Sequence, residues 1–493
     1  MLNSSQRNPL LMHSLQQWGL LGIIALLGAV PRLIHLAYPM QYDEAYTFMA
    51  FARPSLYYAL TDYHLPNNHV FHSVLVHIST RLWGEYRWAI RLPAFLAGWF
   101  LIPATYIVAK RFYNPRVATI AAILVAGWPN LINYSANARG YSLIMLLTMG
   151  LFYLATRVLH EDRLGLWLLM SVLAAIGLFT VPVMAYPLAV LSIWMFMEAI
   201  QGRFWPTYRT TTLLRRFALT SLITVLLTFL FYTPILMVSG SQSLFANSFI
   251  KRYPWIEFWQ KVPTWLPYFR DEWGTGLTNW FSGCILVLAI VGAIAHRQVA
   301  KPYTPLALPI SIVILFALVF YRVELVTRAW LFLIPFLLML AAAGMVAIGD
   351  WIHKRWGWAL LLVLVLTGMV FFDIRKVVNE WPYVWGEMDR LEKTALFLSQ
   401  KTQVDDLVLV NFPVDPQMWY YLSQYQPHPV RLKYKGGEIG HVWAVVDTVS
   451  GQNLDYVIRG RNLPKCNDPE DYHRIREIEG VILYRCDIED GGN

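Results

Sequence analysis

The sequence has 493 residues, of which 57% are hydrophobic and only 14% are charged. Soluble domains contain roughly 45–50% apolar and about 25% charged residues, so the composition argues against a soluble multidomain enzyme. Collagen-like, disordered and disulfide-scaffold proteins are excluded, because apolar residues are abundant, glycine has no period and there are only three Cys.

The charge is distributed unevenly along the chain. The segment from Asp373 to Asn493 has 19 acidic and 14 basic residues, a net charge of −5. The first 372 residues therefore have a net charge of +14, which gives the total of +9. This division predicts a membrane domain over 1–372 and a water-soluble domain over 373–493.

Eleven apolar runs are long enough to cross a bilayer core, which requires roughly 17 to 25 residues. The first run lacks an Ala-x-Ala-like exit and is followed by ten more, so it predicts a retained helix rather than a secretory signal. The runs lie near residues 18–38, 91–109, 117–133, 141–156, 164–180, 183–200, 217–238, 278–295, 303–320, 331–349 and 356–372.

The positions of Lys and Arg in the connecting loops indicate the orientation. With a cytoplasmic N-terminus, the inside segments hold 14 basic residues in about 59 positions. The outside loops hold ten in about 140 positions. The predicted topology therefore places the C-terminal domain outside, and the charge of +9 is an orientation signal rather than evidence for nucleic acid.

The first outer loop, 39–90, is long for a connector, and loops of that length are usually functional. It contains the segment 70–83 (VFHSVLVHISTRLW), which is apolar but has only about 14 residues, too few to span. We expect it to form a helix on the outer membrane surface.

The pattern of the C-terminal segment predicts a small α/β domain. Strand patterns occur at 406–411, 441–447 and 480–486, and a short helix is predicted over 416–425. Because no glycine-rich phosphate loop occurs there, a docking, lid or acceptor-presenting role is favoured over independent catalysis.

The first candidate site is the pair Asp43 and Glu44, just after the first span. A carboxylate pair at a membrane boundary is costly to desolvate, so its presence suggests function. The alternative is a solvated loop in which Asp43 caps a helix that begins at Glu44.

The second candidate site is the segment 64–72 (HLPNNHVFH). Its Pro-Asn-Asn sequence is typical of a helix start, where free backbone N–H groups can bind phosphate. The alternatives are histidines that merely lie at headgroup level, or a divalent-metal site with Asp43 or Glu44, for which there is no recognised spacing. The candidate ligands are His64, Asn67, Asn68, His69 and His72.

Two further candidates follow in later outer loops. The segment 133–141 (NYSANARGY) contains Arg139 and Tyr141, and the segment 321–328 (YRVELVTR) contains Arg322 and Arg328. Guanidinium groups fit phosphate or carboxylate recognition. We interpret Arg322 as an interface anchor, whereas Arg328 lies one residue inside a span and needs a partner there.

All four candidates fall on the same predicted membrane face. An acid or base and cationic groups beside lipid suit a phosphate-bearing lipid substrate. The main rival hypothesis is a transporter or flippase of a lipid-linked sugar, which predicts inverted repeats and broken helices at mid-membrane. A second rival is a membrane-anchored binding protein whose C-terminal domain is the active part.

The motifs Asp43-Glu44, Pro66-Asn-Asn-His69, Arg91-Leu-Pro93 and Ala138-Arg139-Gly-Tyr141 together resemble bacterial members of glycosyltransferase family 39. That group includes protein O-mannosyltransferases and the aminoarabinose transferase of lipid A. Arg328-Ala-Trp-Leu-Phe-Leu-Ile-Pro335 is similar to a late pattern in the same group.

The resemblance implies a polytopic α-helical membrane protein of the GT-C type, with about 11 transmembrane helices and a small C-terminal α/β extracytoplasmic domain. It implies a cell-membrane enzyme that moves a sugar from a polyprenyl-phosphate donor to a lipid, polysaccharide or protein acceptor outside. Asp43 would be the general base with Glu44 in support, and the Asn68-His69 region and Arg328 would lie near the lipid phosphate.

Some relatives have an acidic residue in the second outer loop, where this chain has Asn133, Asn137 and Arg139. That departure leaves a second carboxylate role and any metal site open. Cys466 and Cys486 both lie in the predicted outer domain, where a disulfide is chemically allowed, and their pairing is also left open. The sugar, the acceptor and the oligomeric state do not follow from the sequence.

Overall fold

The computed structural model describes residues 4–201, 210–245, 252–275, 277–323, 326–352, 388–426, 431–434, 436, 439–461, 463 and 465–488, with isolated positions between 365 and 386. Its contacts form two compact units. We call Met1–Leu36 with Ser55–Asn379 the helical unit, and Ala37–Pro54 with Glu380–Asn493 the α/β unit. The domain limits 1–372 and 373–493 stay a prediction, and the contacts add that Ala37–Pro54 folds with the C-terminal residues.

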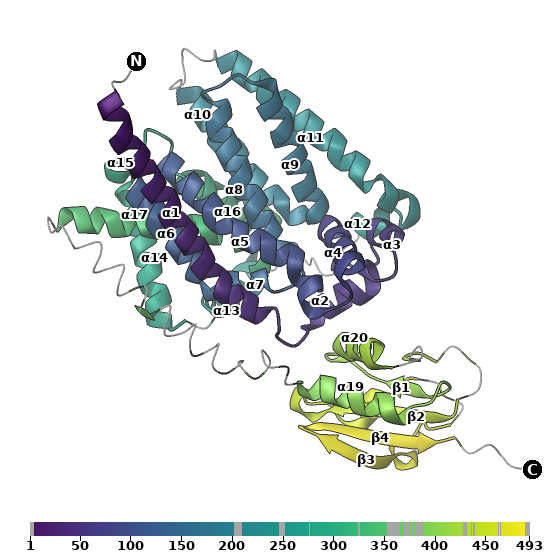
Figure 1. Cartoon of the computed structure of the whole chain (residues 1–493). Coiled ribbons are helices and arrows are strands. Elements are labelled where there is room, and N and C mark those ends of the chain that lie inside the picture. Colours follow the sequence, from purple (N-terminus) through teal and green to yellow (C-terminus); the bar gives the residue numbers. More distant parts are fainter. Residues whose placement is uncertain are drawn as a thin grey trace, which may run out of the picture. The chain divides into compact units, whose positions relative to one another are not determined.

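The helical unit is a bundle of apolar helices (Figure 1). Within it, α5 packs against α1, α6 and α8, whereas α9 packs against α8 and α11. Its elements are α1 (Ser4–His35), α3 (Leu56–Thr61), α4 (Val70–Trp83), α5 (Arg87–Phe112), α6 (Pro115–Gly127), α7 (Pro129–Ser135), α8 (Tyr141–Val158), α9 (Leu164–Thr180), η2 (Pro182–Met184), α10 (Ala185–Gln201), α11 (Thr210–Val238), α12 (Ser241–Phe245), α13 (Trp255–Trp273), α14 (Asn279–Ile294), α15 (His296–Val299), α16 (Ala307–Phe316), η3 (Ala317–Tyr321), η4 (Thr327–Leu333) and α17 (Ile334–Trp351).

The described residues contain six helices long and apolar enough to cross a membrane, or seven if the bent pair α6 and α7 is one span. This confirms a multi-pass membrane protein, with fewer candidate spans than the eleven predicted runs. Three shorter apolar helices, Leu164–Thr180, Asn279–Ile294 and Ala307–Tyr321, coincide with three other predicted runs. The run 356–372 lies almost entirely outside the described residues. The predicted helix over 70–83 is confirmed as α4.

The predicted span 117–133 is broken, because α6 and α7 meet at an angle of 61°. Pro129 has no N–H, so the carbonyl of Val125 four residues earlier loses its helical donor. Arg32 on α1 donates to the carbonyls of Val125 at 3.0 Å and Ala126 at 2.6 Å. Its fully buried guanidinium therefore binds backbone groups that lipid could not satisfy.

Helices α14 and α17 approach each other through two glycines. A Cβ at Gly292 would lie 2.0 Å from the carbonyl oxygen of Leu340, and one at Gly344 would lie 2.0 Å from that of Leu288. Glycine is therefore required at both positions, as at other close helix contacts inside membranes.

The α/β unit is built on a four-stranded sheet of order β1-β2-β4-β3. The β1 and β2 strands are parallel, and β4 is antiparallel to both β2 and β3. Its elements are α2 (Tyr42–Thr47), η1 (Phe48–Ala52), α19 (Arg390–Lys401), β1 (Leu407–Leu409), α20 (Asp415–Tyr425), β2 (His441–Asp447), η5 (Thr448–Ser450), α21 (Leu454–Ile458), η6 (Pro469–Asp471), β3 (His473–Ile478) and β4 (Val481–Asp487).

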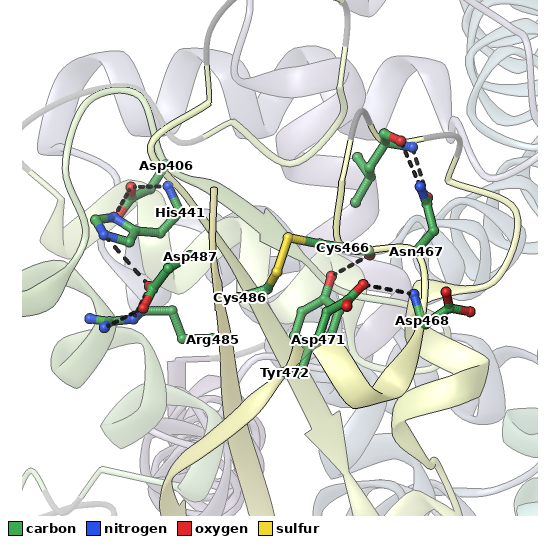
Figure 2. Close-up of a disulfide and its surroundings, with 11 residues drawn as sticks. Asp406, His441, Cys466, Asn467, Asp468, Asp471, Tyr472, Arg485, Cys486 and Asp487 are labelled. Carbon is green, nitrogen blue, oxygen red and sulfur yellow. Dashed lines mark hydrogen bonds and ion pairs between the residues drawn. A yellow bond between two sulfur atoms is a disulfide. The ribbon is translucent and has the colours of Figure 1, made fainter. Parts of the chain in front are cut away.

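The sheet confirms the small C-terminal α/β region that was predicted. A disulfide joins Cys466 to Cys486 of β4 (Figure 2), so the pairing left open by the sequence does form. To the left of the disulfide in Figure 2, the buried carboxylate of Asp406 accepts a hydrogen bond from the backbone N–H of His441 at 2.9 Å. It also accepts one from Trp443 Nε1 at 3.1 Å. These bonds attach the start of β1 to β2.

Candidate functional site

The beginnings of two helices meet in the helical unit. His69 precedes α4, Gly140 precedes α8, and the Gly140 N–H donates to His69 Nδ1 at 2.8 Å. Arg139 Nη2 lies 3.1 Å from His69 Nε2. The Tyr141 ring meets the His69 ring edge-on, with 4.9 Å between centroids, and the Arg139 guanidinium lies 5.4 Å from the Tyr141 ring centre. The three side chains are buried. We call His69, Arg139 and Tyr141 the cationic cluster.

Gly140 is needed here for space. A Cβ on it would lie 2.5 Å from Thr180 Cγ2 and 3.3 Å from His69 Nδ1. The backbone N–H reaches the imidazole only because that space is empty, which gives a physical reason for the Ala-Arg-Gly-Tyr sequence.

Both ring nitrogens of His69 face donors. Arginine has no acceptor, and a neutral imidazole has one N–H and one acceptor nitrogen. If Nδ1 accepts from Gly140, the imidazole proton is on Nε2, so that this N–H and the Arg139 guanidinium are both donors. Such a pair would be satisfied together by an acceptor with several oxygens.

Burial holds both histidines of this region neutral. It lowers the pKa of His69 well below its usual range, and the nearby charges of Arg139 and Arg328 lower it further. Burial, followed by the charge of Arg139, lowers the pKa of His72 to about 3. The His72 side chain is fully buried, and neither of its ring nitrogens has a hydrogen-bond partner among the described residues.

A carboxylate that sequence reasoning missed connects three segments of the helical unit. Glu272 of α13 accepts hydrogen bonds from the hydroxyls of Tyr134 on α7 and Thr327 at the start of η4, the latter at 2.7 Å. The Tyr134 ring packs edge-on against Tyr141, with 5.4 Å between centroids. Because Thr327 precedes Arg328, Glu272 links the cationic cluster to that arginine.

The sequence could not have indicated Glu272. It lies in an outer loop without a recognised motif, and its partners are 138 and 55 residues away along the chain. Arg328 itself is exposed on η4, and its positive charge disfavours protonation of His69. The structure therefore brings His69, Arg139 and Tyr141 together, and Arg328 lies near enough for its charge to act on His69.

His64 and Asn68 have other partners. His64 is exposed, and its Nδ1 lies 2.6 Å from Asp62 Oδ1. Asn68 is buried, donates to the Asp62 carbonyl at 2.8 Å, and accepts from the Ser73 hydroxyl at 2.7 Å. These bonds hold the loop before α4 in place.

The expected helix start at Pro66-Asn-Asn is wrong. Helix α4 begins at Val70, and Pro66 and Asn67 form a turn before it. The Asn68 amide is hydrogen-bonded to the preceding loop, so the first helical N–H groups lie further along the chain than predicted. Ligand roles for His64, Asn67 and Asn68 stay predictions.

Asp43 and Glu44 lie in the α/β unit, in the first turn of α2. The N-cap of this helix is Gln41, so the alternative interpretation of Asp43 as a cap is wrong. Glu44 is fully buried, and its Oε1 accepts the backbone N–H of Gln41 at 2.8 Å. This bond stabilises the helix start, whereas Asp43 is half-buried.

The second carboxylate that sequence reasoning missed, after Glu272, lies in the α/β unit. Asp415 opens α20, which packs against α2. Burial raises the pKa of Tyr42 to about 12, and the charges of Asp415 and Asp43 add to this shift. Burial also raises the pKa of Asp415. No local pattern indicates that α20 and α2 pack together, because 373 residues separate Tyr42 from Asp415.

No group of three or more His, Cys, Asp or Glu side chains suited to a metal ion occurs among the residues that the structure describes. The suggested metal site of His69 and His72 with a loop carboxylate therefore has no support in these residues.

Comparison with known proteins identifies the architecture. Residues 68–227 match the family of dolichyl-phosphate-mannose-protein mannosyltransferases. ArnT from Cupriavidus metallidurans bound to undecaprenyl phosphate aligns with a TM-score of 0.62 and 12% identity, over 94% of this chain and 97% of that chain. The chain has the GT-C glycosyltransferase fold. The resemblance predicted from the motifs is thereby confirmed.

A more distant GT-C protein agrees. The Archaeoglobus fulgidus oligosaccharyltransferase in complex with zinc and sulfate aligns with a TM-score of 0.57 and 12% identity, over 87% of this chain and 68% of that chain. No curated protein sequence matches this GT-C chain significantly. His69, Arg139 and Tyr141 lie inside the family match, whereas Asp43, Glu44 and Arg328 lie outside it.

Proposed function

We propose that this GT-C protein transfers a sugar from a polyprenyl-phosphate donor to a hydroxyl of an extracytoplasmic lipid, polysaccharide or protein acceptor. The observation that carries the proposal is the buried pair of His69 and Arg139, with 3.1 Å between Nε2 and Nη2, within the segment that matches the mannosyltransferase family.

The donor pair supports phosphate recognition. A phosphate oxygen accepts from several N–H groups at once, so it resolves the opposition of the His69 and Arg139 donors. The positive charge of Arg328 also acts at His69. In a low-dielectric site, such preorganised donors stabilise the negative charge that develops on a leaving phosphate. Two solved GT-C structures, ArnT with undecaprenyl phosphate and an archaeal oligosaccharyltransferase with dolichol phosphate, contain a lipid phosphate.

The proposed reaction is a single displacement. The acceptor oxygen bonds to the anomeric carbon, the bond from that carbon to the phosphate oxygen breaks, and the acceptor proton moves to the Asp43 carboxylate. Polyprenyl phosphate leaves, and the anomeric configuration inverts. The buried Glu44 supports this role by fixing the start of the helix that contains Asp43.

We propose the following membrane topology for the enzyme. Eleven spans place the N-terminus in the cytoplasm and residues 373–493 outside the cell membrane, with the loop 39–90 on the outer face. The excess of basic residues in the inner loops supports this orientation. The Cys466–Cys486 disulfide is also consistent with an oxidising compartment.

The rival transporter hypothesis has one feature in its favour, the break between α6 and α7. A transporter uses such a break to bind its substrate with freed backbone groups. Here the freed carbonyls of Val125 and Ala126 accept hydrogen bonds from Arg32, so this break is explained without a substrate.

The deciding experiment offers the purified full chain, reconstituted in vesicles, a panel of polyprenyl-phosphate sugars together with native membrane lipid, polysaccharide or protein. We expect release of polyprenyl phosphate in step with sugar on one acceptor class, measured by mass spectrometry, with the anomeric configuration inverted. Movement of a fluorescent lipid-linked sugar across the vesicle without transfer would instead establish the transporter.

A further inference from the structure

A polar pocket lies in the connection between α14 and α16. It has a volume of about 500 Å³ and is lined by His296, Arg297, Lys301 and Tyr303, with small and proline residues between them. The Lys301 N–H donates to the carbonyl of Phe112, the last residue of α5, at 2.8 Å. We call this cavity the basic pocket.

The basic pocket is remote from the cationic cluster. Tyr303 faces His160, just beyond the end of α8, with 6.3 Å between ring centroids. The cationic cluster lies at the beginning of the same helix, at Tyr141. Eighteen residues of α-helix separate the two ends by about 27 Å. The pocket is therefore a separate site.

Its lining is held rigidly. His296 Nε2 lies 3.1 Å from the Tyr303 carbonyl, and Trp194 Nε1 donates to the Thr304 carbonyl at 3.2 Å. The buried Tyr303 ring packs against Phe112 and Trp194, at 5.2 and 5.9 Å between centroids. A preorganised wall loses little conformational entropy when a ligand binds.

Several basic side chains gather at this pocket. Burial lowers the pKa of the Lys301 ammonium group, and the nearby charges of Arg111 and Lys110 at the end of α5 lower it further. Lys301 and Arg297 are exposed, and within the described ranges neither forms an ion pair. A bound anion would relieve this like-charge repulsion.

The acids nearest along these helices already have partners. Glu161 pairs with Arg157 at 2.7 Å, and the Glu198 carboxylate accepts the backbone N–H of Thr304 at 2.5 Å. Among the described residues, neither acid forms an ion pair with Arg297 or Lys301.

We propose that the basic pocket binds a phosphate group. Arg297 and Lys301 are its expected ligands, as in other basic pockets between membrane helices. The two sources of such a group are the headgroup of an anionic phospholipid and a soluble phosphate. The neighbouring side chains of Ile294, which is 80% exposed, and Leu308, which is 48% exposed, offer acyl chains an apolar surface, which favours the phospholipid.

The test measures the melting temperature of the detergent-purified full chain, and bound lipid by native mass spectrometry. The probes are dioleoylphosphatidylglycerol, dioleoylphosphatidylcholine as the neutral lipid, and inorganic phosphate against an equal concentration of chloride. We expect phosphatidylglycerol to raise the melting temperature and to remain bound, and phosphatidylcholine to do neither. If only inorganic phosphate stabilises the protein, the pocket is still a phosphate-binding site, but its ligand is soluble rather than a phospholipid.

Substitutions assign the effect to the pocket. Lys301→Gln and Arg297→Gln should each weaken phosphatidylglycerol binding roughly tenfold, because each removes a charge-assisted hydrogen bond. Arg215→Gln is the matched control, since Arg215 is exposed, lies in another predicted inner loop and does not line the pocket. The proposal is overturned if both single variants bind the lipid as tightly as the parent, or if Arg215→Gln loses as much.

Discussion

The two compact units contain opposite kinds of charge at their candidate functional groups. The helical unit gathers the neutral donor His69 and the two cations Arg139 and Arg328. The α/β unit contains the carboxylates of Asp43 and Asp415. Asp43 and His69 lie 26 positions apart in one predicted loop, yet they belong to different units. Substitutions in the helical unit should therefore affect the proposed phosphate binding, and substitutions in the α/β unit the proposed proton transfer.

The largest expected effect comes from the α/β unit. Asp43→Asn keeps the shape of the side chain but cannot take the acceptor proton, so we expect the transfer rate to fall roughly 10²- to 10⁴-fold. The melting temperature should change little, because Asp43 is only half-buried. Asp405→Asn, an exposed acid in the same unit, is the control and should transfer sugar normally. Near-normal transfer by Asp43→Asn would show that Asp43 is not the general base.

The next effect tests the helical unit. Arg139→Gln removes a buried cation that faces His69, and we expect kcat/KM for the donor to fall roughly 10- to 100-fold. Arg139→Lys keeps the charge without the planar fork and should lose less. The control is Arg116→Gln, which alters an exposed arginine paired with Asp350. Equal rates for Arg139→Gln and the control would show that this cluster does not bind the donor phosphate.

A smaller effect is expected at Glu272, which positions the cluster. In Glu272→Gln only one terminal oxygen remains, so either Tyr134 or Thr327 loses its acceptor, and kcat should fall roughly three- to tenfold. Tyr134→Phe should give a similar loss, and the double variant less than the product of the two.

The control for this cycle is Glu257→Gln on the same helix, where the carboxylate lies 3.9 Å from Lys261. Strict multiplication of the Glu272→Gln and Tyr134→Phe losses would show that these residues act independently.

The smallest effect concerns the stability of the helical unit against acid. The pKa of His72 is about 3 in the folded chain and about 6.5 when unfolded. Above pH 6.5 the imidazole is neutral in both states. Between pH 6.5 and 3 only the unfolded state takes up a proton, so stability falls by about 1.4 kcal/mol per pH unit.

His72→Leu should therefore reduce the decrease in melting temperature between pH 7 and pH 5. His64→Gln should leave that decrease unchanged, because His64 is exposed. If His72→Leu has the same pH profile as the parent, another group is responsible for the acid sensitivity.

Sequence reasoning predicted features that depend on neighbouring residues and missed those that depend on residues brought together by folding. Helix α4 and strand β2 were predicted with their observed limits because periodicity and turn residues act over a few positions. The break after α6 was not predicted, although Pro129 is its local cause, because a proline within a span is compatible with either a kink or a continuous helix. The roles of Asn68 and Glu44 were also hidden, since their hydrogen bonds depend on how the loops fold back.

Composition and local pattern alone determined that this is a multi-pass membrane protein with a small α/β region, because hydropathy and strand alternation are properties of neighbouring residues. The motifs also indicated the family, and they named His69, Arg139, Tyr141 and Arg328. Only the tertiary structure decided that His69, Arg139 and Tyr141 meet, that Arg328 acts on His69 through its charge, and that Glu272 bonds to Tyr134 and Thr327 beside them. It also decided that Asp43 and Glu44 fold with the C-terminal residues. Packing between distant segments sets burial, and burial determines which of the few polar groups can act together.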